Sequence, residues 1–330
     1  GLGIALLLLA MIVAVIERKY LKSAMVMVPT VLLVVIGIGL YPQIANSGKT
    51  ESSDSFHTRF ERESLYGWVR VIDKPKENIR LLTVDASTIG AASIGHGENL
   101  LTYQKIVTHI PALVPNMKSA LLIGQGAGHM AMALKDYGIV TDTLEIDPAV
   151  AEAANKFFGF IPTGRTIIGD ARYEIRQLQG PCDLIILDVF TGGSEPTHLL
   201  TVEAHGLLAD HGILALNFVS FLENGHNAAL ASVAKTLSQV FPHQQVFISD
   251  PGADFNDFIF LATNHAINLE DAVLPNAHTA WLKQRALQID SSRGVILTDN
   301  LSQLERLQIR KSEYYRRMIV DSLGTRHFIR

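Results

Sequence analysis

Glycines and acidic side chains follow apolar runs at regular intervals through the middle of this sequence. Glycines between a strand and a helix allow a tight turn, and they let a ligand approach the backbone and the helix end. A carboxylate at a strand end can bind ribose hydroxyls or accept a proton. The pattern predicts a nucleoside-binding site that contains a general base. Its members are Gly124, Gly126 and Gly128 in GQGAG, followed by Glu145, Asp170 and Asp188.

Two of the acids have candidate roles in holding a nucleoside. Glu145 ends TDTLE and is placed to accept both hydroxyls of a ribose, whereas Asp147 is better placed to cap the helix that begins near Pro148. Asp170 and the backbone of Ala171, in IGDAR, are placed to read an adenine edge. The alternative for Asp170 is that it only caps the helix that follows.

Asp188 ends the apolar run CDLIIL and is the candidate acid/base group. It is followed by VFTGGSEPTHLLT, whose glycines suggest a loop over the site. His198, in the same stretch, is a candidate proton-handling group. The 12 histidines match no standard metal spacing and there is one cysteine, so we expect no metal site and no disulfide within the chain.

Alternating strand and helix patterns must position these residues. From Leu101 onward, apolar β-type runs such as SALLIG and CDLIILDVF alternate with helical stretches such as PAVAEAANKFFG. This alternation predicts an α/β, Rossmann-like, doubly wound sheet, with the ligand at the carboxyl ends of its strands. Before it, SLYGWVRVID and IRLLTVD predict a β-hairpin domain. Acids at three later strand ends favour the AdoMet type of this fold over the NAD type.

The N-terminus is strongly apolar. Gly1 to Ile16 and Ala24 to Tyr41 are each near the length of a membrane-spanning helix, and ERKYLK joins them. A signal peptide fits poorly, because the first run has no basic start and a second run follows at once. We expect two transmembrane helices from a longer membrane region. Basic residues on both sides leave the orientation open.

These patterns divide the chain into five parts. The C-terminal part includes a basic helix, around Arg310, Lys311, Arg316 and Arg317, that we expect to be solvated rather than bound to a membrane or partner. The net charge of −4 gives no case for nucleic-acid binding. The parts are transmembrane helices (1–42), a linker (43–63), the β-hairpin domain (64–102), the Rossmann-like catalytic domain (103–265) and a helical extension (266–330).

At these residues the chain resembles the spermidine synthase family, and more closely its membrane-embedded, spermidine-synthase-like bacterial branch. The resemblance rests on ESLYGWVRVID, LLTYQKIVTHIPAL, LLIGQGAG, LEID, GDAR and LDVFTGGSEPTHLLT. It implies a homodimer with a β-hairpin domain and a Rossmann-like catalytic domain. It also implies transfer of an aminopropyl group from decarboxylated AdoMet to putrescine, which releases methylthioadenosine. A multi-pass protein of the bacterial inner membrane is expected, with a cytoplasmic catalytic domain because AdoMet is cytosolic.

The resemblance assigns roles to individual residues. Gln104, beside Tyr103, matches a Tyr-Gln pair and would face the cofactor tail. The three glycines would pass close to the cofactor, Glu145 would bind its ribose, and Asp170 and Ala171 its adenine.

Asp188 matches the acid that deprotonates the attacking amine. This step is needed because an ammonium has no lone pair, so a carboxylate must take a proton before nitrogen attacks the sulfonium-bound carbon. The candidate substrate residues are Tyr103, Thr191, Glu195 and His198.

The chain departs from the family at several polyamine-binding positions. Ala127 replaces the glycine-loop acid that holds the donor's ammonium, and Thr191 replaces a second acid for the diamine. Ile89 and Lys105 replace a Gln and a Glu, and SDPGADF at 249–255 replaces an aromatic element. A diamine would lose several charge-assisted hydrogen bonds, each about 1.5–3 kcal/mol.

Three functions remain open from the sequence. The first is aminopropyl-type transfer, with Asp188 as the acid/base group and AdoMet or decarboxylated AdoMet as donor. Glu195, Glu203 and Asp254 are candidate replacements for the missing acids. The second is an AdoMet-dependent methyltransferase, or another enzyme that consumes AdoMet, which the loss of the acid at Ala127 favours. The third is a non-catalytic nucleoside-sensing domain of a membrane protein. The partners expected are a small-molecule amine or other acceptor and the lipid bilayer.

Overall fold

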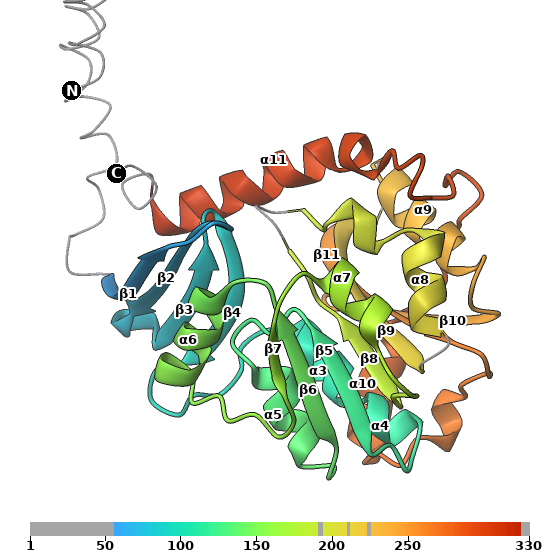
Figure 1. Ribbon diagram of the computed structural model, residues 1–330, viewed down its shortest axis with the longest axis horizontal. Helices are drawn as coiled ribbons and strands as arrows, with labels where there is room; N and C mark the ends of the chain where they lie inside the picture. Colours follow the sequence, from blue (N-terminus) through green and yellow to red (C-terminus); the bar gives the residue numbers. More distant parts are fainter. Residues whose placement is uncertain (1–55, 191–193, 210–211, 223–225, 325–330) are drawn as a thin grey trace, which may run out of the picture. The chain divides into compact units, whose positions relative to one another are not determined.

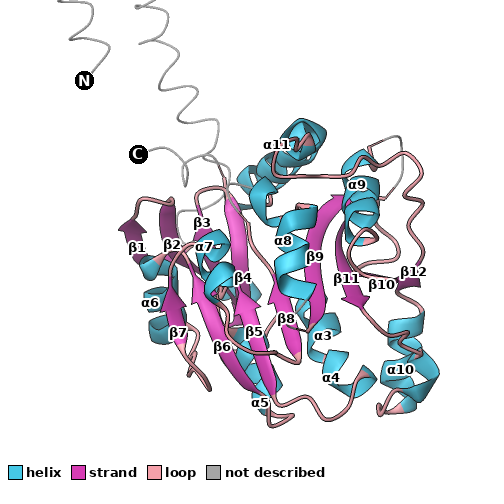
Figure 2. Ribbon diagram, turned by 45° about the vertical axis from the view of Figure 1, so that its right-hand side comes forward, coloured by secondary structure: helices cyan, strands magenta, loops and turns pink. Residues whose placement is uncertain are grey.

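Two β-sheets organise the part of the chain that the computed structural model describes (Figures 1 and 2). The chain divides into two units, and every described residue belongs to the unit 53–328. The described ranges are 56–190, 194–209, 212–222 and 226–324.

The two predicted membrane spans, 1–16 and 24–41, lie outside the described residues. Across the ranges that are described, no helix is both long and apolar enough to cross a membrane.

The smaller sheet is antiparallel, in the order β1-β2-β3-β4, and contains the predicted hairpin. The chain reverses after β2 through Pro75–Glu77 and Asn78, which adopts a left-handed conformation (φ 56°). Its strands are β1 (His57–Glu63), β2 (Trp68–Lys74), β3 (Ile79–Val84) and β4 (Ser87–Ser93).

The linker predicted for 43–63 is wrong over its last part, because His57–Glu63 forms β1. The residues of this edge strand are mostly polar and exposed, so they lack the alternating apolar pattern of a strand. Backbone pairing with β2 holds the strand, and the ring of Phe60 lies 5.6 Å from that of Phe157.

The larger sheet has the order β12-β10-β11-β9-β8-β5-β6-β7. The strands from β9 to β7 are parallel, which confirms the predicted βα alternation, and β10, β11 and β12 are antiparallel additions. The strands are β5 (Ser119–Ile123), β6 (Val140–Glu145), β7 (Thr166–Ile168), β8 (Leu184–Leu187), β9 (Ile213–Phe221), β10 (His243–Ile248), β11 (Phe255–Thr263) and β12 (Ala286–Leu287).

Helices cover both faces of this sheet (Figure 2). Leu121 and Ile123 of β5 join one buried cluster with α8 and α9, whereas Ala120 and Leu122 join another with α3, α4, α5 and α10. This alternation explains the continuous apolar runs of the strands. The helices are α3 (Thr102–Thr108), α4 (Ile110–Leu113), α5 (His129–Lys135), α6 (Pro148–Phe157), α7 (Ala171–Glu174), α8 (Val202–Ala209), α9 (Ala228–Leu237), α10 (Asn276–Lys283) and α11 (Leu304–Leu323).

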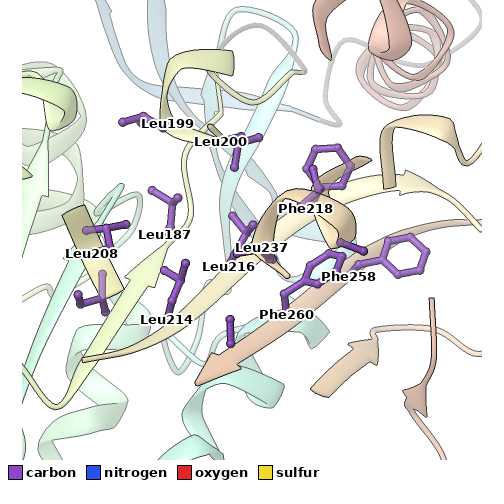
Figure 3. Packing of buried hydrophobic residues seen from close by; sticks show 14 of the residues in the cluster. Leu187, Leu199, Leu200, Leu208, Leu214, Leu216, Phe218, Leu237, Phe258 and Phe260 are labelled. Atoms are coloured by element: carbon purple, nitrogen blue, oxygen red, sulfur yellow. The ribbon is translucent and has the colours of Figure 1, made fainter. Parts of the chain in front are cut away.

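The first cluster forms a buried core around Leu187, the last residue of β8 (Figure 3). Leu187, Leu216, Phe218 and Phe258 each have at most 1% of their surface exposed. Burial of such side chains contributes about 1.5–3 kcal/mol each. The core therefore fixes the strand end that carries Asp188.

Helix α11 extends from the small sheet, where it contacts β4, to the large sheet, where it contacts β9 and α9 (Figure 1). The hydroxyl of Tyr315 donates to the Thr88 carbonyl and accepts from the Thr88 amide, both at 3.2 Å. The prediction of a solvated basic face is wrong for Lys311, which is buried, while Arg310 and Arg316 are exposed.

Candidate functional site

A cavity of about 740 Å³ lies at the carboxyl ends of β5, β6 and β8. The position is the one expected for a ligand in an open α/β sheet. Further walls come from the small sheet, from the segment 249–257 that leads into β11, and from the C-terminal part of α11. Its polar walls include Glu145, Asp147, Asp170, Asp188, Ser249 and Asp257.

The backbone of the glycine loop lines the cavity without any side chain in front of it. Gly124 (φ +89°) and Gly126 (φ +53°) both line it and adopt left-handed conformations. A Cβ on Gly124 would lie 2.0 Å from the carbonyl oxygen of Asp188, and one on Gly126 would lie 2.8 Å from that of Ile89. Side chains at these positions would displace neighbouring backbone, so the loop can keep its close course only with glycine.

The other half of the loop faces away from the cavity. Ala127 is 1% exposed, and a Cβ on Gly90 of β4 would lie only 2.7 Å from its methyl carbon. Gly128 lies against the ring of Phe160, where a Cβ would approach to 2.3 Å. Neither residue lines the cavity, so the predicted cofactor contact of Gly128 stays a prediction.

Glu145 is held at the end of β6 by backbone amides. One carboxylate oxygen accepts from the amides of Gln125 (3.2 Å) and Gly126 (3.4 Å), and the other from that of Asp147 (3.1 Å). Burial raises the pKa of Glu145 to about 7, although these hydrogen bonds lower it. Asp147 caps α6 through the amide of Ala149 (2.8 Å), as predicted.

Asp170 and Ala171 lie at the end of β7 and line the cavity. The Asp170 carboxylate accepts from the amide of Tyr173 (3.1 Å), so it caps α7 while facing the cavity. The bare glycine backbone, the Glu145 carboxylate and the exposed Asp170 fit an adenosyl group, whose ribose and base offer hydrogen-bond donors.

Asp188 occupies the floor of the cavity. Its carboxylate accepts from the hydroxyl of Tyr103 (2.9 Å) and from the side-chain amide of Asn217 (2.9 Å). Burial raises its pKa to about 6, against the lowering effect of these two bonds. Gln104 lies behind this group and donates to the Tyr103 hydroxyl (3.1 Å). Gln104 does not line the cavity, so its contact with a cofactor tail stays a prediction.

Asp257, in β11, is a cavity residue that the sequence analysis missed. Its pKa is raised to about 6, mainly by burial and also by the charge of Asp188, while hydrogen bonds from Asn217 and Ser249 oppose this rise. Asp257 is inside a strand, whereas the sequence analysis selected acids at the carboxyl ends of predicted strands, so Asp257 was not selected. The available signal was a polar Asn-Asp pair within an otherwise apolar run.

Of the other predicted substrate residues, His198, Thr191 and Glu195, the structure describes two, and one of them lines the cavity. His198 lines the cavity, and Thr191 lies outside the described residues. Glu195 is buried and does not line it. Its carboxylate binds Lys311 of α11, and it accepts from Gln308 and from the amide of Val219, both at 2.8 Å. Glu195 thus anchors α11.

Known proteins support a transferase. No family model matches the chain. It is 28% identical over 242 residues to the N-terminal histidine N-methyltransferase of Emericella nidulans, covering 64% of this chain and 43% of that protein. It is 37% identical over 117 residues to the polyamine aminopropyltransferase of Vibrio vulnificus, covering 32% of this chain and 39% of that protein. The chain thus spans about two fifths of these curated relatives.

The fold is that of a spermidine synthase. The structure of a probable spermidine synthase from Corynebacterium glutamicum matches with a TM-score of 0.61 at 19% identity, over 74% of this chain and 98% of that one. At this identity the similarity concerns the fold alone.

Proposed function

We propose that the chain is an enzyme that transfers an alkyl group from an AdoMet-type donor to a nitrogen atom, in an aminopropyl-type reaction. The observation that carries this proposal is Asp188, a carboxylate on the cavity floor held by Tyr103 and Asn217. Both curated relatives are named as transferases, one of a methyl group to the nitrogen of an N-terminal histidine and the other of an aminopropyl group.

Asp188 acts as the proton acceptor. The donor supplies a sulfonium-bound carbon. As the nitrogen lone pair forms its bond to that carbon, the carbon–sulfur bond breaks and sulfur leaves with the electron pair as a neutral thioether. An ammonium acceptor gives a proton to Asp188 before this attack, because only the neutral amine has a lone pair, and the product amine then carries the positive charge that sulfur loses. Tyr103 and Asn217 orient the carboxylate through its two oxygens.

The residues at the ends of β5, β6 and β7 bind and orient the donor. Gly124 and Gly126 leave room for it against the backbone, and Glu145 and Asp170 offer carboxylates to its ribose and base. The loop amides hold Glu145, and its carboxylate oxygens keep further lone pairs for the ribose hydroxyls.

Methyl transfer from AdoMet is the second candidate. Ala127 is packed against Gly90, so no acid at this loop position binds a donor ammonium. The relative from Emericella nidulans is named as a methyltransferase. The residue roles are unchanged in this alternative, because Asp188 again removes the proton from nitrogen.

Calorimetry and product analysis separate the candidates. The full chain is titrated with AdoMet, decarboxylated AdoMet and methylthioadenosine, and products are identified by mass spectrometry with an amine present. Methylthioadenosine formed from decarboxylated AdoMet supports aminopropyl transfer. S-adenosylhomocysteine formed from AdoMet supports methyl transfer. Absence of binding by all three compounds contradicts both.

We also propose that residues 1–41 anchor the enzyme in a bacterial inner membrane as part of a multi-pass region, with the catalytic part in the cytoplasm and acting as a homodimer. The support is the two apolar runs and the cytosolic supply of AdoMet. A reporter fused after Tyr41 tests the orientation, and an active reporter of the periplasmic type there contradicts it. The mass of the detergent-solubilised protein tests the dimer.

A further inference from the structure

The cavity contains two carboxylates where the proposed reaction needs only one base. We propose that Asp257 binds the cationic nitrogen of the acceptor together with Asp188, and that the remainder of the acceptor is apolar. This inference rests on the proposed function and defines its acceptor as an amine with one charged end.

Asp257 is placed to bind a ligand. It lines the same cavity as Asp188, the two carboxylates are close enough for their charges to interact, and both side chains retain accessible surface inside the cavity. Ser249 donates to Asp257 at 3.3 Å. Among the residues that the structure describes, neither aspartate has an ion-pair partner.

The cation nearest to this pair is already engaged. Lys311 interacts with Asp257 through its charge, but its ammonium is bound to Glu195, and the two side chains are only 3% and 1% exposed. Two adjacent carboxylates in a buried site disfavour each other's ionisation. An incoming ammonium relieves this repulsion and donates to both, so the pair selects a cation.

The acids considered from the sequence do not serve this purpose. Glu195 is bound by α11, and Glu203 accepts from the amide of Asp299 (3.0 Å). Neither Glu203 nor Asp254 lines the cavity. Asp257 therefore supplies the second charge at the acceptor end.

The cavity wall formed by Phe255 and α11 is apolar. Phe255, Tyr315, Met318 and Ile319 line the cavity, and the Tyr315 hydroxyl is occupied by the backbone of Thr88. A second ammonium on the acceptor would lose its hydration against these side chains without gaining a partner there. A monoamine with an apolar chain therefore fits better than a diamine of the same length.

The remaining acids of the cavity are on other walls or have local partners. Glu145, Asp147 and Asp170 lie at the ends of β6 and β7, on the donor side. Asp250 is exposed and accepts from the amide of Gly252 (2.9 Å) in its own turn.

Calorimetry with the full chain in detergent tests the inference. n-Hexylamine, 1,6-hexanediamine and 1-hexanol are titrated with and without saturating methylthioadenosine. Hexylamine is expected to bind at least about 10-fold more tightly than either of the others, because the diamine buries an unpaired charge and the alcohol has none. Tighter binding of the diamine, or equal binding of the alcohol, would overturn the inference without any variant.

Asp257→Asn removes the charge while keeping the shape. It is expected to weaken hexylamine binding roughly 10- to 100-fold and to leave methylthioadenosine binding unchanged. The matched control is Asp136→Asn, which removes an exposed charge at the end of α5, outside the cavity. Unchanged hexylamine affinity in Asp257→Asn would contradict the proposed role of Asp257 and leave the proposed function untouched. Absent nucleoside binding in the unmodified chain counts against the proposed function instead.

Discussion

At the scale of single residues, burial gives the acids of this site their properties. Asp188 and Asp257 have pKa values raised to about 6, and that of Glu145 is raised to about 7. Raised values near the operating pH are typical of carboxylates that exchange protons in catalysis. Ordinary surface carboxylates titrate near 4 and would be weaker bases.

The first prediction concerns activity and pH. Asp188 must be ionised to take a proton. On the acid side of the pH profile, kcat/KM is therefore expected to rise with a midpoint near pH 6 and to reach a plateau above it. Asp188 and Asp257 interact, so the measured midpoint belongs to the pair. Asp257→Asn is expected to shift this midpoint downward, because it removes a neighbouring negative charge. A rate that is flat between pH 5 and 7.5 would contradict the assignment.

A second prediction concerns stability. The folded-state pKa of Asp188, about 6, exceeds the ordinary aspartate value of 3.8, so the folded chain binds more protons than the unfolded chain between these pH values. The contribution of Asp188 to the free energy of unfolding is therefore fully present below about pH 4 and is lost as the pH rises through about 6. At pH 8, Asp188→Asn is expected to raise the free energy of unfolding by up to about 3 kcal/mol. Denaturant titrations at pH 4 and pH 8 measure this, and lower stability of the variant at pH 8 would refute it.

At the scale of elements, the sequence predicted the strand ends well and the long-range contacts poorly. The apolar runs determine β5, β6 and β8, and each places a candidate residue at its carboxyl end, so Gly124, Glu145 and Asp188 meet in one cavity. Strand β1 was missed because its exposed side chains carry no apolar pattern.

Two further differences have the same physical origin. In the predicted helical extension (266–330), helix α10 ends at Lys283, and Ala286–Leu287 instead forms a strand that pairs with β10. Lys311 is buried because Glu195, far away in the sequence, offers it a carboxylate. Local composition cannot indicate a partner that only the tertiary fold brings near.

Helix α11 supports the third prediction. Lys311→Met leaves the Glu195 carboxylate buried without its cation and is expected to lower the free energy of unfolding by about 3–5 kcal/mol. Adding Glu195→Gln removes the orphaned charge and is expected to restore most of this loss. The double-mutant cycle is measured by denaturant unfolding of the four forms. Additive losses would show that the two residues do not act as a pair.

At the scale of the whole described unit, the cavity joins parts that are far apart in the sequence. Loops of the small sheet, the strand ends of the large sheet and α11 each supply a wall. A ligand in the cavity therefore contacts all three elements at once. Binding couples directly to the stability of the folded chain.

The fourth prediction follows from this coupling. Methylthioadenosine at 100 times its dissociation constant is expected to stabilise the folded chain by about 2.7 kcal/mol. Thermal unfolding with increasing ligand measures the effect, and adenine-free ribose serves as the control. An unchanged melting temperature at high methylthioadenosine would contradict a nucleoside site in this cavity.

The most direct test of the central claim is a comparison of Asp188→Asn with the unmodified chain. Donor affinity is measured by calorimetry, and a single turnover with an amine is followed by mass spectrometry. Loss of the proton acceptor is expected to slow transfer by roughly 10²–10⁴-fold while donor affinity stays within about twofold. If Asp188→Asn transfers the group at the unmodified rate, Asp188 is not the base and the proposed mechanism is wrong.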